Sequence, residues 1–404
     1  MVATETGVQG PDRSAPAALP VVARRRTRVP NVIRPVLIFF TSRAVVAIAA
    51  KGAALIPPKA FVMDLFGKWD GAWYLAVAQR GYPSHVPVAT GNPGQSDVAF
   101  FPLFPLLIRA FHAIVPVSWP WSALILSTLF GLTATVALWQ LACRLTDRDV
   151  ADRVVLLFCF FPGSIVFTMF YAEGLMLTLS ILCLEALMRH RWLVAGVLAA
   201  LATATRPNAM VLAICCAWAA AMAIRERREW WSLVAVALAP LGAVAYFGYL
   251  WHRTGSLLAW FHVESRGWGE RVDFGVKTVD RLHTAFVHPW VNPNNVATSA
   301  GLIFVLLAIP FLLRARLPAV LVIFTAGIIL LGVWSRTLGL RPRFVLTAFP
   351  LFIALGMRLR PTVQQLRVAR VGRDADADDG ARRALAYRAM IRGATWRESC
   401  VSVG

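Results

Sequence analysis

Long apolar runs, separated by short polar segments, dominate the chain from residue 36 to residue 357. An α-helix needs roughly 20 apolar residues to cross the hydrocarbon core of a bilayer. The runs therefore predict an all-α membrane protein, a bundle of about ten transmembrane helices. The predicted spans cover residues 36–56, 119–143, 154–170, 174–188, 192–205, 209–224, 231–251, 298–313, 318–335 and 343–357. Kinks or partial spans are expected near Pro162, Pro207 and Pro240, because proline interrupts helical hydrogen bonding.

Basic segments between the runs predict the orientation, because cytoplasmic loops carry an excess of Lys and Arg. Arginines cluster before the first run, and later clusters follow alternate runs at "RHR", "RERRE" and "LRAR". This pattern predicts an integral plasma-membrane protein with both termini in the cytoplasm. The expected organisation is a disordered basic leader at 1–35, a transmembrane domain at 36–357 with external loops at 57–118 and 252–297, and a basic cytoplasmic tail at 358–404.

The composition excludes several classes of protein. With 58% hydrophobic and 15% charged residues, the chain is too apolar for an ordinary water-soluble globule. The net charge of +20 comes mostly from arginine clusters between the apolar runs, so no nucleic-acid partner is expected. The low lysine content is typical of a GC-rich genome, such as an actinobacterial one. No metal or other cofactor is expected, because compact metal-ligand spacing is missing among His252, His262, His283 and His288.

One acid lies between aromatic rings at the start of the first external loop, in "GKWDGAWYLAVAQRGY". Apolar residues recur at three- and four-residue spacing from Val62 to Val77, which predicts an amphipathic helix in the membrane interface. Asp70 has no obvious local partner there. It either caps a helix that begins at Gly71 or acts as a general base tuned by the surrounding rings.

Further polar residues fall on the predicted external side. Tyr171 and Glu173 lie at a turn between two spans, where the carboxylate is either a sugar ligand or a solvated turn residue. Arg206 precedes Pro207 and Asn208, and an arginine at such a break either binds phosphate or snorkels to the interface. External arginines break the positive-inside pattern and indicate an anionic ligand: they are Arg336, Arg341 and Arg343.

Two external segments are rich in aromatic residues. "AFFPLFPLLIRAF", from Ala99 to Phe111, predicts a proline-kinked interfacial helix that forms the wall of a lipid groove. The loop from Trp251 to Phe274 mixes tryptophans with Glu264 and Glu270. Such a mixture suits a sugar acceptor, although an aromatic belt beside a membrane span has the same composition.

The order of four segments resembles the PIG-V family of mannosyltransferases, which belong to the GT-C class of polytopic membrane glycosyltransferases. The segments are "KWDGAWYLAVAQRGY", "AFFPLFPLL", "PGSIVFTMFYAEGL" and "ATRPN", and the resemblance extends from Trp69 to Asn208. The family's W-D-x-x-[YF] pattern falls on Trp69 and Asp70 with Trp73 or Tyr74. GT-C enzymes usually place an essential acid in this loop, so the resemblance implies a catalytic role for Asp70, and Trp69, Trp73 and Tyr74 are expected at the substrate.

Two further family patterns match in this half of the chain. The Y-x-E-[SA]-L turn corresponds to Tyr171, Glu173 and Leu175, with Gly174 where the family has Ser or Ala. The R-[SP]-N pattern corresponds to Arg206 and Asn208 with the proline between them. No motif maps onto the C-terminal half, so the three external arginines there depend on the topology alone.

The resemblance implies transfer of mannose from a polyprenyl-phosphate mannose to a glycolipid or lipid-linked glycan acceptor at the external membrane surface. The predicted mechanism is inverting, with Asp70 as general base and Arg206, Arg341 or Arg343 at the leaving phosphate. These residues are expected to converge on one external cavity.

The alternatives are transfer of another sugar from its polyprenyl phosphate, and transport of a lipid, for which Arg43 is the main charge deep in a span. No internal repeat supports the transporter.

Overall fold

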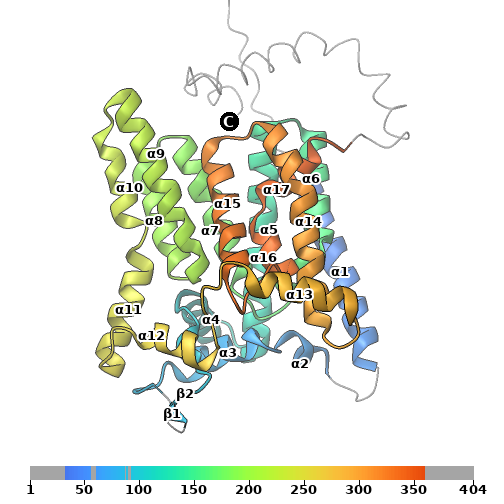
Figure 1. The fold of residues 1–404 in the computed structure, drawn as a ribbon, viewed down its shortest axis with the longest axis vertical. Helices are drawn as coiled ribbons and strands as arrows, with labels where there is room; N and C mark the ends of the chain where they lie inside the picture. Colours follow the sequence, from blue (N-terminus) through green and yellow to red (C-terminus); the bar gives the residue numbers. More distant parts are fainter. Residues whose placement is uncertain (1–31, 56–60, 87, 90–91, 360–404) are drawn as a thin grey trace, which may run out of the picture.

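A bundle of upright helices stands on a layer of short helices that run across its lower end (Figure 1). The computed structural model describes residues 32–55, 61–86, 88–89 and 92–359. Most of the predicted leader and almost all of the predicted tail lie outside the described residues. The all-helical fold predicted from the apolar runs is confirmed, with one two-stranded hairpin of two residues per strand.

The upright bundle contains most of the long helices and three helices of six or seven residues. They are α1 (Ile33–Leu55), α5 (Trp119–Leu145), α6 (Arg148–Phe160), α7 (Glu173–Met188), α8 (Trp192–Thr203), α9 (Val211–Arg227), α10 (Leu233–Leu238), α11 (Leu241–Thr254), α14 (Pro293–Ala315), α15 (Ala319–Trp334), α16 (Pro342–Thr347) and α17 (Pro350–Gly356). Short turns of helix join some of them: η2 (Pro162–Phe167), η3 (Pro207–Met210) and η4 (Trp230–Ser232).

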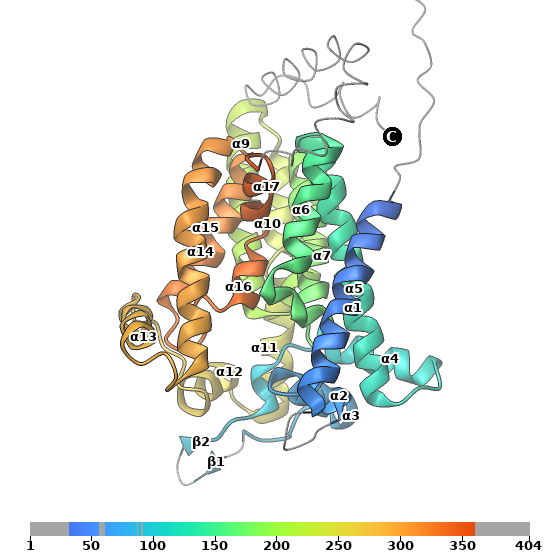
Figure 2. The same ribbon diagram turned by 90° about the vertical axis from the view of Figure 1, so that its right-hand side faces the viewer.

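The lower layer is built from the two segments predicted as external loops. It contains α2 (Val62–Phe66), α3 (Asp70–Arg80), β1 (Val88–Ala89), β2 (Asn92–Pro93), η1 (Asp97–Ala99), α4 (Leu103–Ile114), α12 (Ala259–His262), η5 (Val263–Gly267) and α13 (Val276–Val287). In the side view, α4 and α13 project on opposite sides of the bundle (Figure 2). The described ends of the chain, at α1 and α17, lie at the opposite end of the bundle.

Five helical stretches in the described part of the chain are long and apolar enough to cross a membrane. They are Ile33–Leu55, Trp119–Leu145, Pro207–Arg227, Trp230–Thr254 and Pro293–Ala315. The other predicted spans correspond to shorter helices, so the count of about ten stays a prediction.

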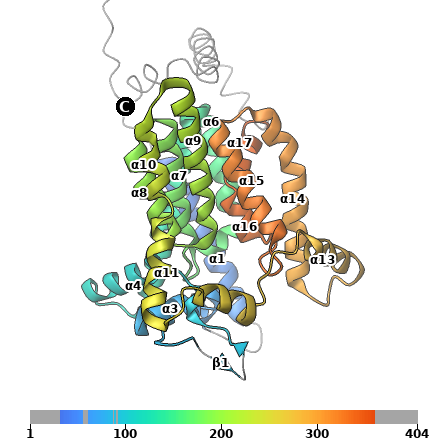
Figure 3. The same cartoon turned by 60° about the vertical axis from the view of Figure 1, so that its left-hand side comes forward.

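Prolines divide several predicted spans, as their chemistry requires. The predicted span 231–251 is split into α10 and α11 at Pro240, and α11 continues into the lower layer (Figure 3). The predicted span 154–170 is interrupted near Pro162, as expected, because α6 ends at Phe160 and η2 begins at Pro162. The helix predicted for 343–357 is also interrupted, between α16 and Pro350.

Helix α7 lies at the centre of the bundle, and nearly all of its residues are buried. It packs closely on α5 through Gly174, where a Cβ atom would lie 2.8 Å from the backbone nitrogen of Gly131. The glycine that departs from the family pattern therefore has a packing reason in this chain. The close contact at Gly174 also sets the position of Glu173 along the bundle, because Glu173 is the first residue of α7.

Arg43 on α1 is buried, and its partners are structural. Its guanidinium donates hydrogen bonds to the carbonyl of Cys159 and to both the carbonyl and the hydroxyl of Ser164. A buried arginine bonded to three groups of one turn attaches α1 to the end of α6. Because Arg43 has a structural role, its buried charge no longer supports the alternative of a lipid transporter.

Candidate active site

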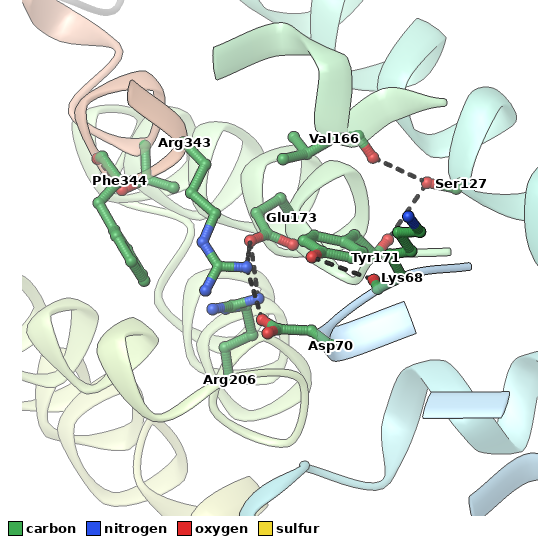
Figure 4. A network of polar contacts seen from close by, with 10 residues as sticks. Lys68, Asp70, Ser127, Val166, Tyr171, Glu173, Arg206, Arg343 and Phe344 are labelled. Atoms are coloured by element: carbon green, nitrogen blue, oxygen red, sulfur yellow. Dashed lines mark hydrogen bonds and ion pairs between the residues drawn. The ribbon is translucent and has the colours of Figure 1, made fainter. Parts of the chain in front are cut away.

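Asp70 begins α3, directly after a break in the lower layer. The single amphipathic helix predicted from Val62 to Val77 is wrong, because α2 ends at Phe66 and Trp69 adopts a positive φ of 56°. This break turns the first residue of α3 toward the bundle. The side chain of Asp70 is not the helix cap, since its Oδ2 atom accepts a hydrogen bond from Nη1 of Arg343 at 2.6 Å (Figure 4).

Arg343 reaches this position from the first turn of α16. The backbone of Pro342 passes so close to η2 that a Cβ atom on Gly163 would lie 2.2 Å from the Pro342 carbonyl oxygen. The guanidinium lies over the ring of Tyr171 at 5.3 Å and over that of Phe344 at 4.8 Å. Rings on the guanidinium strengthen its hold on a neighbouring anion by limiting access of water.

A second ion pair lies immediately beside the first. Nη1 of Arg206 is 2.8 Å from Oε1 of Glu173, and the same carboxylate oxygen is 3.9 Å from Nη1 of Arg343. Only 1% of the Glu173 side chain and 9% of the Arg206 side chain are exposed. Glu173 thus links the two arginines into one network of alternating charge (Figure 4).

Part of this network has unused hydrogen-bonding capacity. Within the described residues, the buried Oε2 of Glu173 and both amide atoms of Asn208 have no hydrogen-bond partner. Buried polar atoms in folded proteins are nearly always satisfied, by protein, water or a ligand. A sugar, whose hydroxyls both donate and accept, has the chemistry to satisfy both residues.

The charges of the network act on Asp70. Burial would raise the pKa of this carboxyl, but the positive charges of Arg343 and Arg206, the hydrogen bond from Arg343 and the charge of Arg341 lower it below its ordinary value. Asp70 is therefore ionised at neutral pH.

Aromatic rings surround this network on the side of the lower layer. Trp73 stacks on Phe100 at 6.0 Å and meets Trp268 edge-on at 5.7 Å. Tyr74 is 2% exposed and packs edge-on against Phe100. Trp69 differs from these rings, since 71% of it is exposed, so its predicted place at the substrate has no support in the packing.

The predicted external arginines separate into two groups. Arg343 and Arg341 lie on the Asp70 side, where Arg341 also donates to the Thr337 carbonyl at 3.4 Å. Arg336 is exposed and lines a different pocket. Asp70, Arg206 and Arg343 thus converge as expected, whereas Arg336 does not join them.

Comparison with known proteins agrees with the residues gathered here. Residues 59–237 match the family model described as mannosyltransferase (PIG-V). The matched residues are called the PIG-V domain below. The GPI alpha-1,6-mannosyltransferase 2 of Rattus norvegicus is 30% identical over 36% of this chain, and that of Homo sapiens is 29% identical over 35% of it. The chain covers 29% of the length of either relative.

One solved structure with a similar arrangement of helices is ArnT from Cupriavidus metallidurans bound to undecaprenyl phosphate. The similarity covers 74% of this chain and 56% of ArnT, with 13% identity and a TM-score of 0.47. The match to the mannosyltransferase family thus covers residues 59–237, and five helical stretches of the described residues are long and apolar enough to cross a membrane.

The PIG-V domain contributes only part of the network. Asp70, Glu173 and Arg206 lie within the matched residues, but Arg343 and Arg341 lie more than 100 positions beyond their end at residue 237. The C-terminal part of the chain therefore supplies Arg343 and Arg341, whose positive charges lie beside Asp70 of the matched region.

Glu264 is an acidic residue near the network of Asp70, which the sequence named only as one member of an aromatic loop and not as a site residue. It lies on η5, a π-helical turn, and π-helical turns are frequent at functional sites. Burial, with the negative charges of Glu270 and Asp70, raises the pKa of Glu264 to about 8. The signal in the sequence was only a mixture of acids and tryptophans in the loop from Trp251 to Phe274.

Proposed function

We propose that the chain transfers mannose from a polyprenyl-phosphate mannose to a lipid-linked or surface glycan acceptor, with inversion at the anomeric carbon. The observation that carries the proposal is the ion pair of Asp70 with Arg343, next to the buried pair of Glu173 with Arg206. The carboxylate of Asp70 suits a proton acceptor, and the two arginines suit the binding of a phosphate.

In the proposed step, the acceptor hydroxyl attacks the anomeric carbon of the mannose. A glycosidic C–O bond forms while the bond from that carbon to the phosphate oxygen breaks, and the hydroxyl proton passes to Asp70. The polyprenyl phosphate leaves with the electron pair, and Arg343 and Arg206 stabilise its charge. A single displacement needs no covalent enzyme intermediate.

Arg343 couples donor binding to the strength of the base. In the ion pair it lowers the pKa of Asp70, which makes the carboxylate a weak proton acceptor. A donor phosphate that shares Arg343 weakens this pair and raises the pKa of Asp70. The base is thus strengthened when the donor is in place.

Sugar binding is assigned to the unsatisfied polar atoms of Glu173 and Asn208 and to the rings of Trp73, Tyr74 and Tyr171. The site lies at the end of the bundle predicted to be extracytoplasmic, with both termini on the cytoplasmic side of the plasma membrane. A lipid phosphate is already a good leaving group, so the mechanism requires no metal.

The test compares Asp70→Asn with the matched variant Asp64→Asn, which removes an exposed carboxylate from α2 in the same layer. Both variants are reconstituted with radiolabelled polyprenyl-phosphate mannose and total membrane lipid. Asp70→Asn is expected to abolish turnover and leave donor binding intact, while Asp64→Asn keeps normal turnover. Normal turnover by Asp70→Asn would refute the assignment. Competition with polyprenyl-phosphate glucose or arabinose checks the identity of the sugar.

A further inference from the structure

A second group of cations lies on the same end of the molecule, outside the network of Asp70. A pocket of about 520 Å³ is lined by five basic side chains together with Trp268 and Thr337. The basic residues are Arg266, Arg271, Lys277, Arg281 and Arg336. They are called the basic pocket below, and the proposed transfer step uses none of them.

Backbone pairing holds two of these arginines next to each other. The backbone nitrogen of Arg336 donates to the carbonyl of Arg271 at 2.9 Å, and Val272 pairs with Ser335 in an antiparallel bridge. Like charges held close together repel each other unless an anion neutralises them.

The carboxylates near the basic pocket are engaged, one of them with Lys277 of the pocket itself and the others with backbone or hydroxyl groups. Asp273 accepts hydrogen bonds from the backbone nitrogens at the start of α13, and Asp280 pairs with Lys277. Glu270 accepts hydrogen bonds from Ser335 and Thr337. In the described part of the chain, no carboxylate forms an ion pair with Arg266, Arg271 or Arg336.

Arg281 is held in the wall of the basic pocket by backbone carbonyls. Its Nη2 atom donates to the carbonyl of Arg336 at 2.6 Å, whereas its buried Nη1 has no hydrogen-bond partner among the described residues. The basic pocket thus contains three guanidinium groups, those of Arg266, Arg271 and Arg336, that have no ion-pair partner among the described residues. This chemistry fits a phosphate group.

The depth of the basic pocket relative to the membrane follows from α13. This helix carries Lys277 and Arg281 into the pocket while it exposes apolar residues elsewhere on its surface. Val276, Val279 and Phe286 are each about 70% exposed, and Trp290 just beyond the helix is 93% exposed. An amphipathic helix with an exposed apolar face lies in the membrane interface, so the pocket lies at the level of the lipid headgroups.

The basic pocket also adjoins the network of Asp70. Trp268 lines the pocket and contacts the ring of Trp73 on α3. On the other side, Arg341 bonds the carbonyl of Thr337, another residue of the pocket wall. A lipid whose headgroup occupies the pocket therefore has its attached sugar close to Asp70.

We propose that the basic pocket binds the anionic, phosphate-bearing headgroup of the acceptor lipid, separately from the arginines that bind the donor phosphate. The inference rests on the proposed function, because it takes the acceptor to be lipid-borne. Two phosphate sites explain why the external surface has more arginines than one leaving group requires.

The test measures binding directly and needs no transfer. The variant Arg266→Gln/Arg271→Gln/Arg336→Gln is compared with Lys51→Gln/Arg80→Gln/Arg253→Gln, which also removes three exposed positive charges. Calorimetry in detergent uses four probes: dihexanoylphosphatidylglycerol, dihexanoylphosphatidylcholine, farnesyl phosphate and inorganic phosphate. The wild-type protein should bind the anionic lipid more tightly than the zwitterionic lipid and inorganic phosphate. The first variant should lose about 10–100-fold in affinity for the anionic lipid alone, and the control variant should lose none.

Three results would overturn the inference. Unchanged affinity of the first variant for the anionic lipid would exclude the basic pocket as its site. A loss of affinity for farnesyl phosphate would assign the pocket to the donor, and inorganic phosphate binding as tightly as the lipid would indicate a site for a free anion. Arg271→Gln and Arg336→Gln, made singly, carry the same test if the triple variant does not fold. Because transfer is measured separately with Asp70→Asn, failure of the proposed function leaves this result interpretable.

Discussion

Asp70 and Arg343 are separated by 273 positions in the chain, yet their side chains form an ion pair of 2.6 Å. One residue comes from the lower layer and the other from a short helix of the bundle (Figure 4). The pair therefore joins the two parts of the fold at the site proposed for the transfer step.

Arg343→Gln should reduce turnover by about 10²–10³-fold, because it removes a donor aimed at the charge that develops on the leaving phosphate. The loss should appear in kcat with polyprenyl-phosphate mannose as donor. Arg80→Gln, at the exposed end of α3, serves as the control and should retain the wild-type kcat. A kcat for Arg343→Gln within a factor of about two would rule out this role.

Glu173→Gln should destabilise the protein by about 3–5 kcal/mol, because it leaves the charge of Arg206 buried without its partner. The double variant Glu173→Gln/Arg206→Gln should recover part of that loss, since it removes both charges. Thermal unfolding in detergent, followed by tryptophan fluorescence, measures both changes. Equal melting temperatures for Glu173→Gln and the wild type would contradict the buried pair.

Stability should decline as the pH rises from about 4.5 to about 8, through the raised pKa of Glu264. A folded-state pKa above the unfolded value means that the folded protein holds the proton more tightly. The associated stability is complete below the unfolded pKa and is lost as the pH rises through the folded one. Glu264→Gln should flatten this part of the curve of melting temperature against pH. An unchanged slope in the variant would show that Glu264 titrates normally.

Gly174→Ala should destabilise the protein by about 1–3 kcal/mol, because its Cβ atom would meet the backbone of α5 at Gly131. Displacement of α7 would also move Glu173 and lower turnover. Gly248→Ala is the matched control, since nothing lies within 4 Å of a Cβ atom at that position. The control should keep or slightly raise the melting temperature. Equal melting temperatures for the two alanine variants would exclude the close approach of α5 and α7.

Local signals in the sequence predicted much of the architecture. Apolar length identified the membrane helices, and Pro240 marked the break between α10 and α11. Helix breaks that depend on a turn geometry were missed, as between α2 and α3 at Trp69. The periodicity of apolar residues continues across that turn, so the pattern cannot reveal it.

The candidate site was predictable in its residue types but not in its pairings. Asp70, Glu173 and Arg206 were recognisable from short motifs, and Arg343 from its unexpected charge at the external end of a span. Their grouping depends on Gly163 and Gly174, which let helices approach closely, and neither glycine predicts a partner by itself. Arg336 shows the opposite case, because the same charge argument placed it with Arg343 although it lines a different pocket.

From the sequence alone one can predict the helical membrane fold, the segments of the lower layer and the residue types from which a transferase site could be built. Such prediction is possible because hydrophobic length, proline and charge act locally along the chain. The folded structure was needed to show that Asp70 pairs with Arg343, that Glu173 pairs with Arg206, and that Arg336 lies with other cations in a separate basic pocket. Those pairings depend on which helices pack together, and packing is a property of surfaces far apart in the sequence.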